Sequence, residues 1–247
     1  GLNDDKSLAF SAQNDFYYLP NKSLQLPPDT GSTLKGEEDI SYVENPAKVT
    51  GNDQFTAHIS ENDWYETVKL NYGVDYLNER KKYFDPIPPV WEKMVHILEY
   101  WANKGIDGFR CDMVEMVPVE IWNYAIRKIK QQFPDIIFVA EVYNPELYKI
   151  YIEQGGFDLL YDKVGLYDTL KDIVQGHKTT HEITKCWQSL NGLNDKMLSF
   201  MENHDEQRIA SRFFANDPFK VIPAMLLSGT INNGGVMIYF GQEVGEP

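Results

Sequence analysis

From residue 71 onward, the sequence alternates short apolar runs with segments whose apolar residues recur at helical spacing. The apolar runs predict strands at 106–113, 136–142, 157–161, 196–201 and 235–240. The periodic segments predict helices at 91–101, 118–129, 145–154, 166–175, 180–190, 206–214 and 218–228. No hairpin signal separates consecutive strands. The pattern therefore predicts an α/β fold with a parallel sheet and crossover helices.

Residues 1–70 differ from this regular part. They are rich in Asn, Asp, Ser, Pro and Thr and lack long periodic segments, and residues 21–36 have the composition of turns and loops. We therefore predict an irregular insertion with a few short strands over 1–70, followed by the regular α/β part over 71–247.

The charge balance excludes some partners. The 247 residues carry 37 acidic and 23 basic side chains, a net charge of −14, whereas nucleic acid requires a basic footprint. We therefore predict no nucleic-acid partner, and the acidic balance is compatible with a neutral ligand such as a glucan. We also predict no membrane span, because no apolar run reaches about 18 residues. The first ten residues do not resemble a signal peptide. The two cysteines, Cys111 and Cys186, are not expected to form a disulfide.

Three carboxylates lie at or just past the ends of predicted strands. Asp112 lies near the end of the predicted strand in GFRCDMVEMVP, Glu141 lies in FVAEVYN, and Asp205 lies in FMENHDEQ. The ends of parallel strands meet at one face of a barrel, where barrel enzymes keep their active sites. A nucleophile, a proton donor and a third carboxylate placed there indicate cleavage of a glycosidic bond.

The first of these carboxylates has an arginine two residues before it. Alternation along a strand puts Arg110 and Asp112 on the same face. A guanidinium keeps its charge, so it holds the aspartate ionised, as a carboxylate nucleophile requires. A purely structural ion pair at the mouth of the sheet is the alternative.

Glu141 is surrounded by the apolar residues of IIFVAEV. A carboxyl group on a buried strand resists ionisation, which suits a general acid at neutral pH. The alternative is a glutamate at a solvent-exposed strand end. Tyr143 follows two residues later and is a candidate for stacking on a sugar ring, with loop packing as its alternative.

Asn203, His204 and Asp205 follow another apolar strand. Three successive polar residues are costly there unless they are exposed or belong to a site. His204 and Asp205 are candidates for binding sugar hydroxyls and stabilising positive charge at the anomeric carbon. The alternative for Asp205 is the N-cap of a helix over 206–214. The neighbouring Glu202 and Glu206 are predicted to be solvated.

These segments resemble three signature regions of the α-amylase superfamily, glycoside hydrolase family 13. The resemblance implies a (β/α)8 TIM barrel, of which this chain holds strands 4 to 8, preceded by a domain-B-like insertion. It implies that Asp112 is the nucleophile, Glu141 the acid/base and Asp205 the transition-state stabiliser. Arg110 then matches the arginine paired with the nucleophile, and residues 239–243 (YFGQE) are similar to the end of strand 8. The resemblance also implies that Asn203 and His204 belong to the region that binds the sugar in the −1 subsite, so both are substrate-binding candidates.

The sequence departs from the family pattern in two ways. Glu115 and Met116 stand where many α-amylases carry a Lys-His pair that helps to bind sugar and calcium. No cofactor is therefore predicted with certainty, and calcium stays open for the full-length enzyme. Strands 1–3 and the first signature region are not found. We therefore expect a partial catalytic domain of a larger enzyme, and the resemblance favours a secreted or periplasmic location.

The resemblance implies a retaining hydrolase that acts on the α-1,4 bonds of starch or maltooligosaccharides by double displacement. The alternatives are an α-glucan transglycosylase or exo-α-glucosidase of the same superfamily, and a non-catalytic glucan-binding relative. Five strands do not close an eight-stranded barrel. We therefore expect the chain alone to be inactive, and to self-associate through its open edges.

Overall fold

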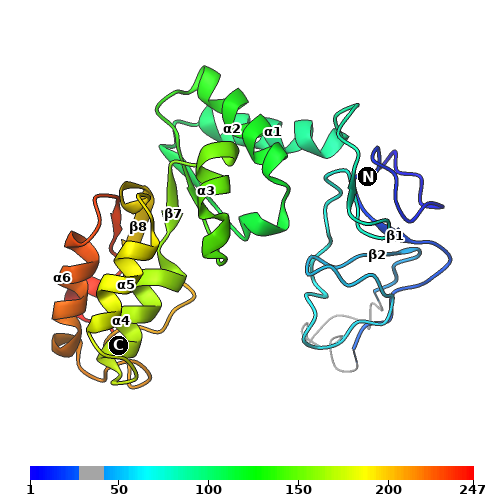
Figure 1. The fold of residues 1–247 in the computed structure, drawn as a ribbon. Coiled ribbons are helices and arrows are strands. Elements are labelled where there is room, and N and C mark those ends of the chain that lie inside the picture. The colour runs from blue at the N-terminus through cyan, green and yellow to red at the C-terminus, as the bar shows by residue number, and fades with distance from the viewer. Residues whose placement is uncertain (28–41) are drawn as a thin grey trace. The chain divides into compact units, whose positions relative to one another are not determined.

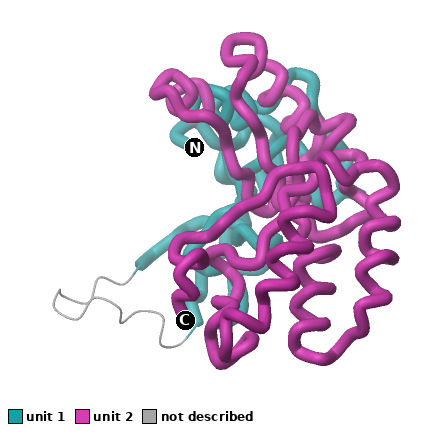
Figure 2. The backbone as a smooth tube through the Cα atoms, turned by 90° about the vertical axis from the view of Figure 1, so that its left-hand side faces the viewer, with its two compact units in different colours: residues 1–97 teal, residues 98–247 magenta. Residues whose placement is uncertain are grey.

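The computed structural model describes residues 1–27 and 42–247. Part of the loop predicted at 21–36 lies outside the described residues. The backbone forms two compact units, Gly1–Ile97 and Leu98–Pro247 (Figure 2). The division falls inside helix α1 (Pro89–Ala102), and the predicted limit of the insertion at residue 70 stays a prediction.

The first unit contains little regular structure among its described residues. Strand β1 (Tyr18–Leu19) pairs antiparallel with β2 (Ala47–Lys48), and β3 (Val74–Asp75) pairs antiparallel with β4 (Lys81–Lys82). Such short strands contribute few ladder hydrogen bonds, so apolar packing must stabilise this unit. One buried cluster in this unit consists of Tyr17, Leu19, Ala47, Val49 and Ala57.

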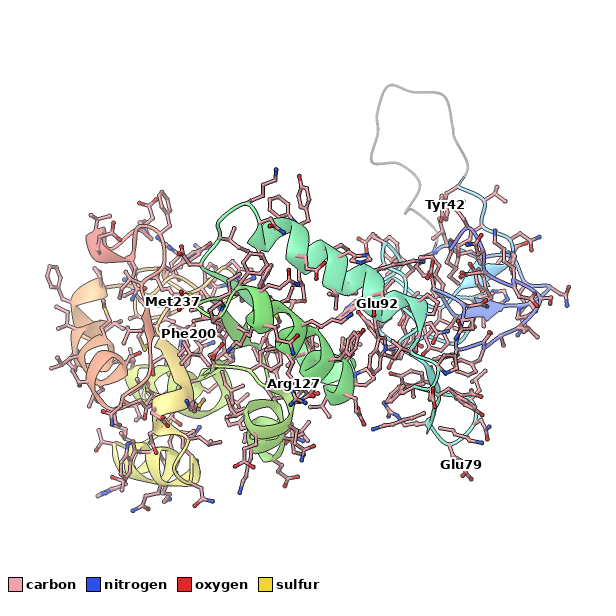
Figure 3. All side chains as sticks on the ribbon, turned by 90° about the horizontal axis from the view of Figure 1, so that it is seen from above. Tyr42, Glu79, Glu92, Arg127, Phe200 and Met237 are labelled. Carbon is pink, nitrogen blue, oxygen red and sulfur yellow. The ribbon has the colours of Figure 1, made fainter. Side chains whose placement is uncertain are left out.

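The second unit is built on a five-stranded sheet whose order follows the sequence (Figure 1). Its strands are β5 (Gly108–Cys111), β6 (Ile137–Ala140), β7 (Leu159–Tyr161), β8 (Met197–Phe200) and β9 (Val236–Met237). All neighbouring strands pair in parallel. Phe200 and Met237, opposite each other on β8 and β9, are labelled in Figure 3. The predicted parallel arrangement is confirmed, although each strand is shorter than predicted.

Helices connect the strands as expected for crossovers. Their bounds are α1 (Pro89–Ala102), α2 (Val119–Gln132), α3 (Tyr148–Ile150), α4 (Asp168–Val174), α5 (His181–Ser189) and α6 (Ile222–Thr230). Short 3-10 turns occupy Val114–Met116, Pro145–Leu147, Asn194–Lys196, Pro218–Val221 and Gln242–Val244, and π-helical turns occupy Tyr151–Gly155 and Lys163–Tyr167. None of the helices in the described part of the chain has the length and apolar character to cross a membrane.

The core of this unit lies between the sheet and its helices. The side chains of Phe138, Leu160 and Met197, from three adjacent strands, are completely buried. Helix α2 adds a buried stripe at helical spacing, composed of Ile121, Ala125, Ile126 and Ile129. Replacing one of its isoleucines by alanine is expected to destabilise the fold by about 2–5 kcal/mol. The sheet curls into half of a barrel, which confirms the predicted partial barrel.

Gly108 is required where β5 meets β6. A Cβ atom at this position would lie 2.6 Å from the carbonyl oxygen of Ile137, its partner in the register. The glycine therefore permits the close pairing of β5 with β6, and this register determines where Arg110 and Asp112 lie along β6.

The helix predicted at 206–214 is absent, and the segment forms turns and bends. Side chains of the preceding residues accept its N–H groups. Asn203 Oδ1 accepts the N–H of Glu206 at 2.8 Å, and Glu202 Oε1 accepts the N–H of Ile209 at 2.7 Å. The prediction was wrong because these tertiary contacts replace the helical hydrogen bonds that the apolar periodicity favoured.

Candidate active site

The strand register brings Asp112 and Glu141 to the same end of the sheet. Cys111 at the end of β5 is paired with Ala140 at the end of β6. Asp112 and Glu141 are the next residues on the two strands, so both carboxylates leave the sheet at one level. Tyr161, at the end of β7, reaches the same region.

Arg110 contacts both carboxylates with one guanidinium group. Its Nη1 pairs with Asp112 Oδ1, and its Nη2 lies 2.8 Å from Glu141 Oε1. The ring centroid of Tyr161 lies 5.3 Å from Arg110 Cζ. Burial lowers the pKa of Arg110, but hydrogen bonds with Asp112 and Tyr161 and the nearby charges of Glu141 and Asp112 raise it overall. The predicted contact with Asp112 is present, whereas the bridge to Glu141 was not predicted.

The two carboxylates have different surroundings. The side chain of Asp112 is 68% exposed, whereas that of Glu141 is only 5% exposed. This burial excludes the alternative of a solvent-exposed glutamate. The N–H of Met113 donates to Glu141 Oε2 at 3.0 Å, so donors hold both oxygens of the buried carboxyl group.

Tyr143 acts on Glu141 directly. Its hydroxyl donates to Glu141 Oε1 at 3.2 Å, while the residue as a whole is 39% exposed. Burial raises the pKa of Tyr143 to about 12, with further contributions from the charge of Glu141 and the hydrogen bond to it. The phenol thus remains a hydrogen-bond donor at neutral pH, and its exposed ring remains available to a ligand.

Asn203, His204 and Asp205 lie in the turn after β8. His204 Nε2 is 3.2 Å from Asp205 Oδ2, and both side chains are about half exposed. Asn203 is buried, and its Oδ1 accepts the N–H of Asp205 at 2.9 Å. No helix follows, so Asp205 is not a helix N-cap. The charge of Asp205 also contributes to the raised pKa of Tyr143.

Glu202 was wrongly predicted to be solvated. Its side chain is fully buried, and its Oε2 lies 2.9 Å from Arg208 Nη1. Burial raises the pKa of Glu202, while the N–H of Ile209 and the charge of Arg208 act in the opposite direction. This pair anchors the beginning and end of the turn that carries Asp205.

Glu206 was also wrongly predicted to be solvated. It lies 3.0 Å from Lys163 Nζ and 3.5 Å from Lys171 Nζ, and it accepts the hydroxyl hydrogen of Tyr167 at 2.8 Å. The three partners recur every four residues along the π turn and α4. That spacing puts the three side chains on one helical face, but no local pattern pairs this face with Glu206.

The residues after the nucleophile position do not fit a calcium site. Glu115 Oε1 accepts the N–H of Asn144 at 2.6 Å, and Met116 offers no hard oxygen ligand. Among residues 1–27 and 42–247, no three His, Cys, Asp or Glu side chains are grouped so that they could hold a metal ion. Both cysteines in this part of the chain are free.

Comparisons with known proteins agree with this arrangement. The alpha amylase catalytic domain family matches residues 14–247. Alpha-amylase 3 of Dictyoglomus thermophilum is 27% identical over 197 residues, which cover 75% of this chain and 39% of that protein. An alpha-1,4-glucan:maltose-1-phosphate maltosyltransferase of Picrophilus torridus is 30% identical over 93 residues, 34% of this chain and 15% of that protein. This chain thus spans well under half of either relative.

The fold also matches solved structures. The cyclic alpha-maltosyl-(1→6)-maltose hydrolase of Arthrobacter globiformis, in complex with its cyclic ligand, aligns with a TM-score of 0.60 at 22% identity. The alignment covers 77% of this chain and 42% of that one. Because the family match extends over most of the chain and includes all three strand-end carboxylates, this protein belongs to the alpha-amylase catalytic domain family of glycosidases.

Proposed function

We propose that this chain carries the catalytic site of a retaining hydrolase that cleaves α-1,4-glucosidic bonds of starch or maltooligosaccharides. The observation that carries the proposal is the Arg110 guanidinium, which contacts Asp112 and Glu141 together. Retaining glycosidases need two carboxyl groups about 5–5.5 Å apart. A single planar guanidinium group that contacts both Asp112 and Glu141 favours that short separation between the two carboxyl groups.

In the first step, the exposed Asp112 acts as the nucleophile. One of its carboxylate oxygens bonds to the anomeric carbon, and the bond from that carbon to the glycosidic oxygen breaks. The departing oxygen keeps the electron pair and takes a proton from the Glu141 carboxyl group. The products are a covalent glycosyl ester of Asp112 and the released sugar chain.

In the second step, water replaces the released chain. The Glu141 carboxylate takes a proton from the water as its oxygen bonds to the anomeric carbon, and Asp112 leaves as a carboxylate. Two inversions give net retention. Asp205 and His204 bind the hydroxyls of the reacting sugar, and their exposure leaves them accessible to it.

The test compares two substrates in Asp112→Asn, Glu141→Gln and the control Asp195→Asn, a matched amide exchange at an exposed site. Loss of the nucleophile abolishes turnover of both maltoheptaose and α-maltosyl fluoride. Loss of the acid lowers kcat/KM about 10²–10⁴-fold on maltoheptaose. It leaves kcat/KM on the fluoride nearly unchanged, because fluoride departs without a strong proton donor. Undiminished activity of Asp112→Asn would refute the proposal.

A glycosyl transferase is the second candidate, and the similarity to the maltosyltransferase favours it. The same three carboxylates form the same covalent intermediate, and only the acceptor differs between water and a sugar. Products from maltoheptaose distinguish the two functions. Shorter sugars alone indicate a hydrolase, whereas products longer than the substrate indicate a transferase. An exo-α-glucosidase would release glucose from the first turnover.

The 247 residues by themselves are expected to be inactive. The described sheet is open, with β5 and β9 at its edges. The assignment of residues 1–70 to a domain-B-like insertion is part of this proposal. Unpaired edges invite association with another chain. Light scattering of the isolated chain, together with the maltoheptaose assay, checks both statements. A stable and active monomer would contradict them.

A further inference from the structure

Met113, between the nucleophile position and the turn Val114–Met116, adopts an unusual backbone conformation. Its φ is 44° and its ψ is 46°, which lies in the left-handed region. An L-residue with a Cβ atom is disfavoured there, and a bulky, unbranched hydrophobic residue gains nothing from local side-chain hydrogen bonds. Surrounding contacts must therefore hold the backbone in this conformation.

Other positive-φ residues in the described part of the chain have simpler explanations. Four of the remaining six non-glycine residues are Asn or Asp, which tolerate this region because their short side chains bond locally. The other two, Glu79 and Arg80, lie in the exposed turn between β3 and β4. Met113 differs from all of these because it lies beside two candidate catalytic carboxylates.

The conformation of Met113 directs its amide at Glu141. The Met113 N–H donates to Glu141 Oε2 at 3.0 Å. The flanking residues hold the backbone of the same glutamate. The Glu141 N–H donates to the carbonyl of Cys111 at 3.0 Å, and the Val114 N–H donates to the Glu141 carbonyl at 3.3 Å. The backbone of segment 111–114 therefore holds both the main chain and the side chain of Glu141.

The two oxygens of Glu141 are held from different sides. Oε1 interacts with Arg110 and accepts the hydroxyl of Tyr143, whereas Oε2 accepts the Met113 amide. Contacts at Oε1 alone restrain only one of the two oxygens, and the terminal torsion of a glutamate has a broad energy minimum. The amide on Oε2 narrows the range of this torsion further.

We propose that Met113 is a positioning residue whose left-handed backbone aims its amide at Glu141 and fixes the plane of the acid/base carboxyl group. The proposal rests on the assignment of Glu141 as the acid/base. It assigns the effect to the backbone of residue 113 and not to its side chain. Substitutions should therefore rank by their tolerance of positive φ, and their size should matter little.

The test uses three substitutions in whichever form of the protein hydrolyses maltoheptaose. Met113→Asn tolerates the left-handed region, Met113→Leu matches the native residue in size and conformational preference, and Met113→Val is β-branched and strongly disfavoured there. We expect the kcat/KM values of Met113→Asn and Met113→Leu on maltoheptaose to stay within about twofold of the native value. We expect Met113→Val to lower kcat/KM on maltoheptaose about tenfold, because a small rise in the activation free energy has an effect of this size.

The second substrate separates positioning from general damage. On α-maltosyl fluoride, Met113→Val should lose less than about twofold, because this substrate needs little proton donation. An equal loss on both substrates would show a merely structural role and overturn the proposal. A loss in Met113→Asn as large as that in Met113→Val would assign the effect to the side chain and also overturn it.

Failure of the underlying assignment would give a different result. If Glu141→Gln loses equally on both substrates, the acid/base assignment itself is wrong, whatever the Met113 series shows. A readout without turnover comes from NMR of the ¹⁵N-methionine-labelled protein. Glu141→Gln should shift the Met113 amide resonance and Asp195→Asn should not. An unmoved resonance in Glu141→Gln would contradict the hydrogen bond.

Discussion

The two sides of the candidate site are held in different ways. On one side, Arg110, Asp112 and Glu141 lie on or directly after the paired strands β5 and β6, and one guanidinium joins both carboxylates. On the other side, His204 and Asp205 lie about half exposed in an irregular turn after β8. The first side is positioned by strand register, and the second by side-chain contacts within the turn and with the preceding π turn.

Two acidic side chains provide these contacts. The fully buried Glu202 links the turn to Arg208 and Ile209, while the largely buried Glu206 links it to the π turn through Lys163 and Tyr167. A site built on regular strands is generally more rigid than one built on a loop. The comparison therefore predicts steep losses when the strand side is altered and smaller, graded losses when the supports of the turn are altered.

The largest effect is expected at Arg110. Arg110→Met leaves the buried Glu141 without its ionic partner, which should lower the free energy of unfolding by about 3 kcal/mol. Misplaced carboxylates should also lower kcat by about 10²-fold or more. Arg110→Lys keeps the charge but cannot contact both carboxylates with one planar group, so activity should fall, with a smaller loss of stability than in Arg110→Met. Urea denaturation and steady-state kinetics measure both effects.

A double variant provides the control for this prediction. Arg110→Met combined with Glu141→Gln removes the unpaired charge, so the free energy of unfolding should recover most of the loss while activity stays absent. Equal stability of the single and double variants would show that the ion pair does not hold the strand side together.

A smaller effect is expected at Glu206. Glu206→Gln retains an acceptor for the Tyr167 hydroxyl but loses the ion pair with Lys163. Stability should fall by about 1 kcal/mol, and kcat by about tenfold, because the turn that carries Asp205 loosens. A loss confined to stability, with kcat unchanged, would separate Glu206 from the positioning of Asp205.

The pH dependence of this effect has a definite sign. Burial raises the pKa of Glu206, but hydrogen bonds from Lys163 and Tyr167 outweigh it, so the pKa lies below its ordinary value of 4.5. A lowered pKa adds stability that is present above pH 4.5 and is lost as the pH falls through the folded-state pKa. The stability difference between the native protein and Glu206→Gln should therefore shrink below that pH. A constant difference would contradict the lowered pKa.

The smallest effect is expected at Lys171. Its Nζ is 3.5 Å from Glu206, farther than Lys163, and its side chain is 28% exposed. Partly exposed ion pairs typically contribute about 0.2–1 kcal/mol, and the longer distance places this pair at the low end of that range. Lys171→Met should leave kcat unchanged, whereas Lys163→Met should resemble Glu206→Gln. A larger loss at Lys171 than at Lys163 would reverse the assigned hierarchy.

The same contrast explains what the sequence could predict. The five parallel strands and the proximity of Arg110 to Asp112 follow from local alternation and apolar periodicity, and both are confirmed. The strand register then brings Glu141 to the level of Asp112. Periodicity failed at 206–214, where the apolar pattern favoured a helix but side chains of Glu202 and Asn203 accept the N–H groups.

The remaining features depend on contacts that no local pattern encodes. The burial of Glu206 depends on partners more than thirty residues earlier, and a negatively charged flank is ordinarily solvated. The positive φ of Met113 has no signal in its residue type, because methionine does not favour the left-handed region. This conformation is explained by the hydrogen bond from the Met113 amide to Glu141.

The most direct test of the account traps the covalent intermediate. In Glu141→Gln, α-maltosyl fluoride should glycosylate the enzyme quickly, while the missing base slows hydrolysis of the ester. Peptide mapping by mass spectrometry should then find one maltosyl group on the peptide that contains Asp112, and none in the double variant that also carries Asp112→Asn. A maltosyl group on another carboxylate, or no covalent adduct with a first product of inverted configuration, would contradict the central claim.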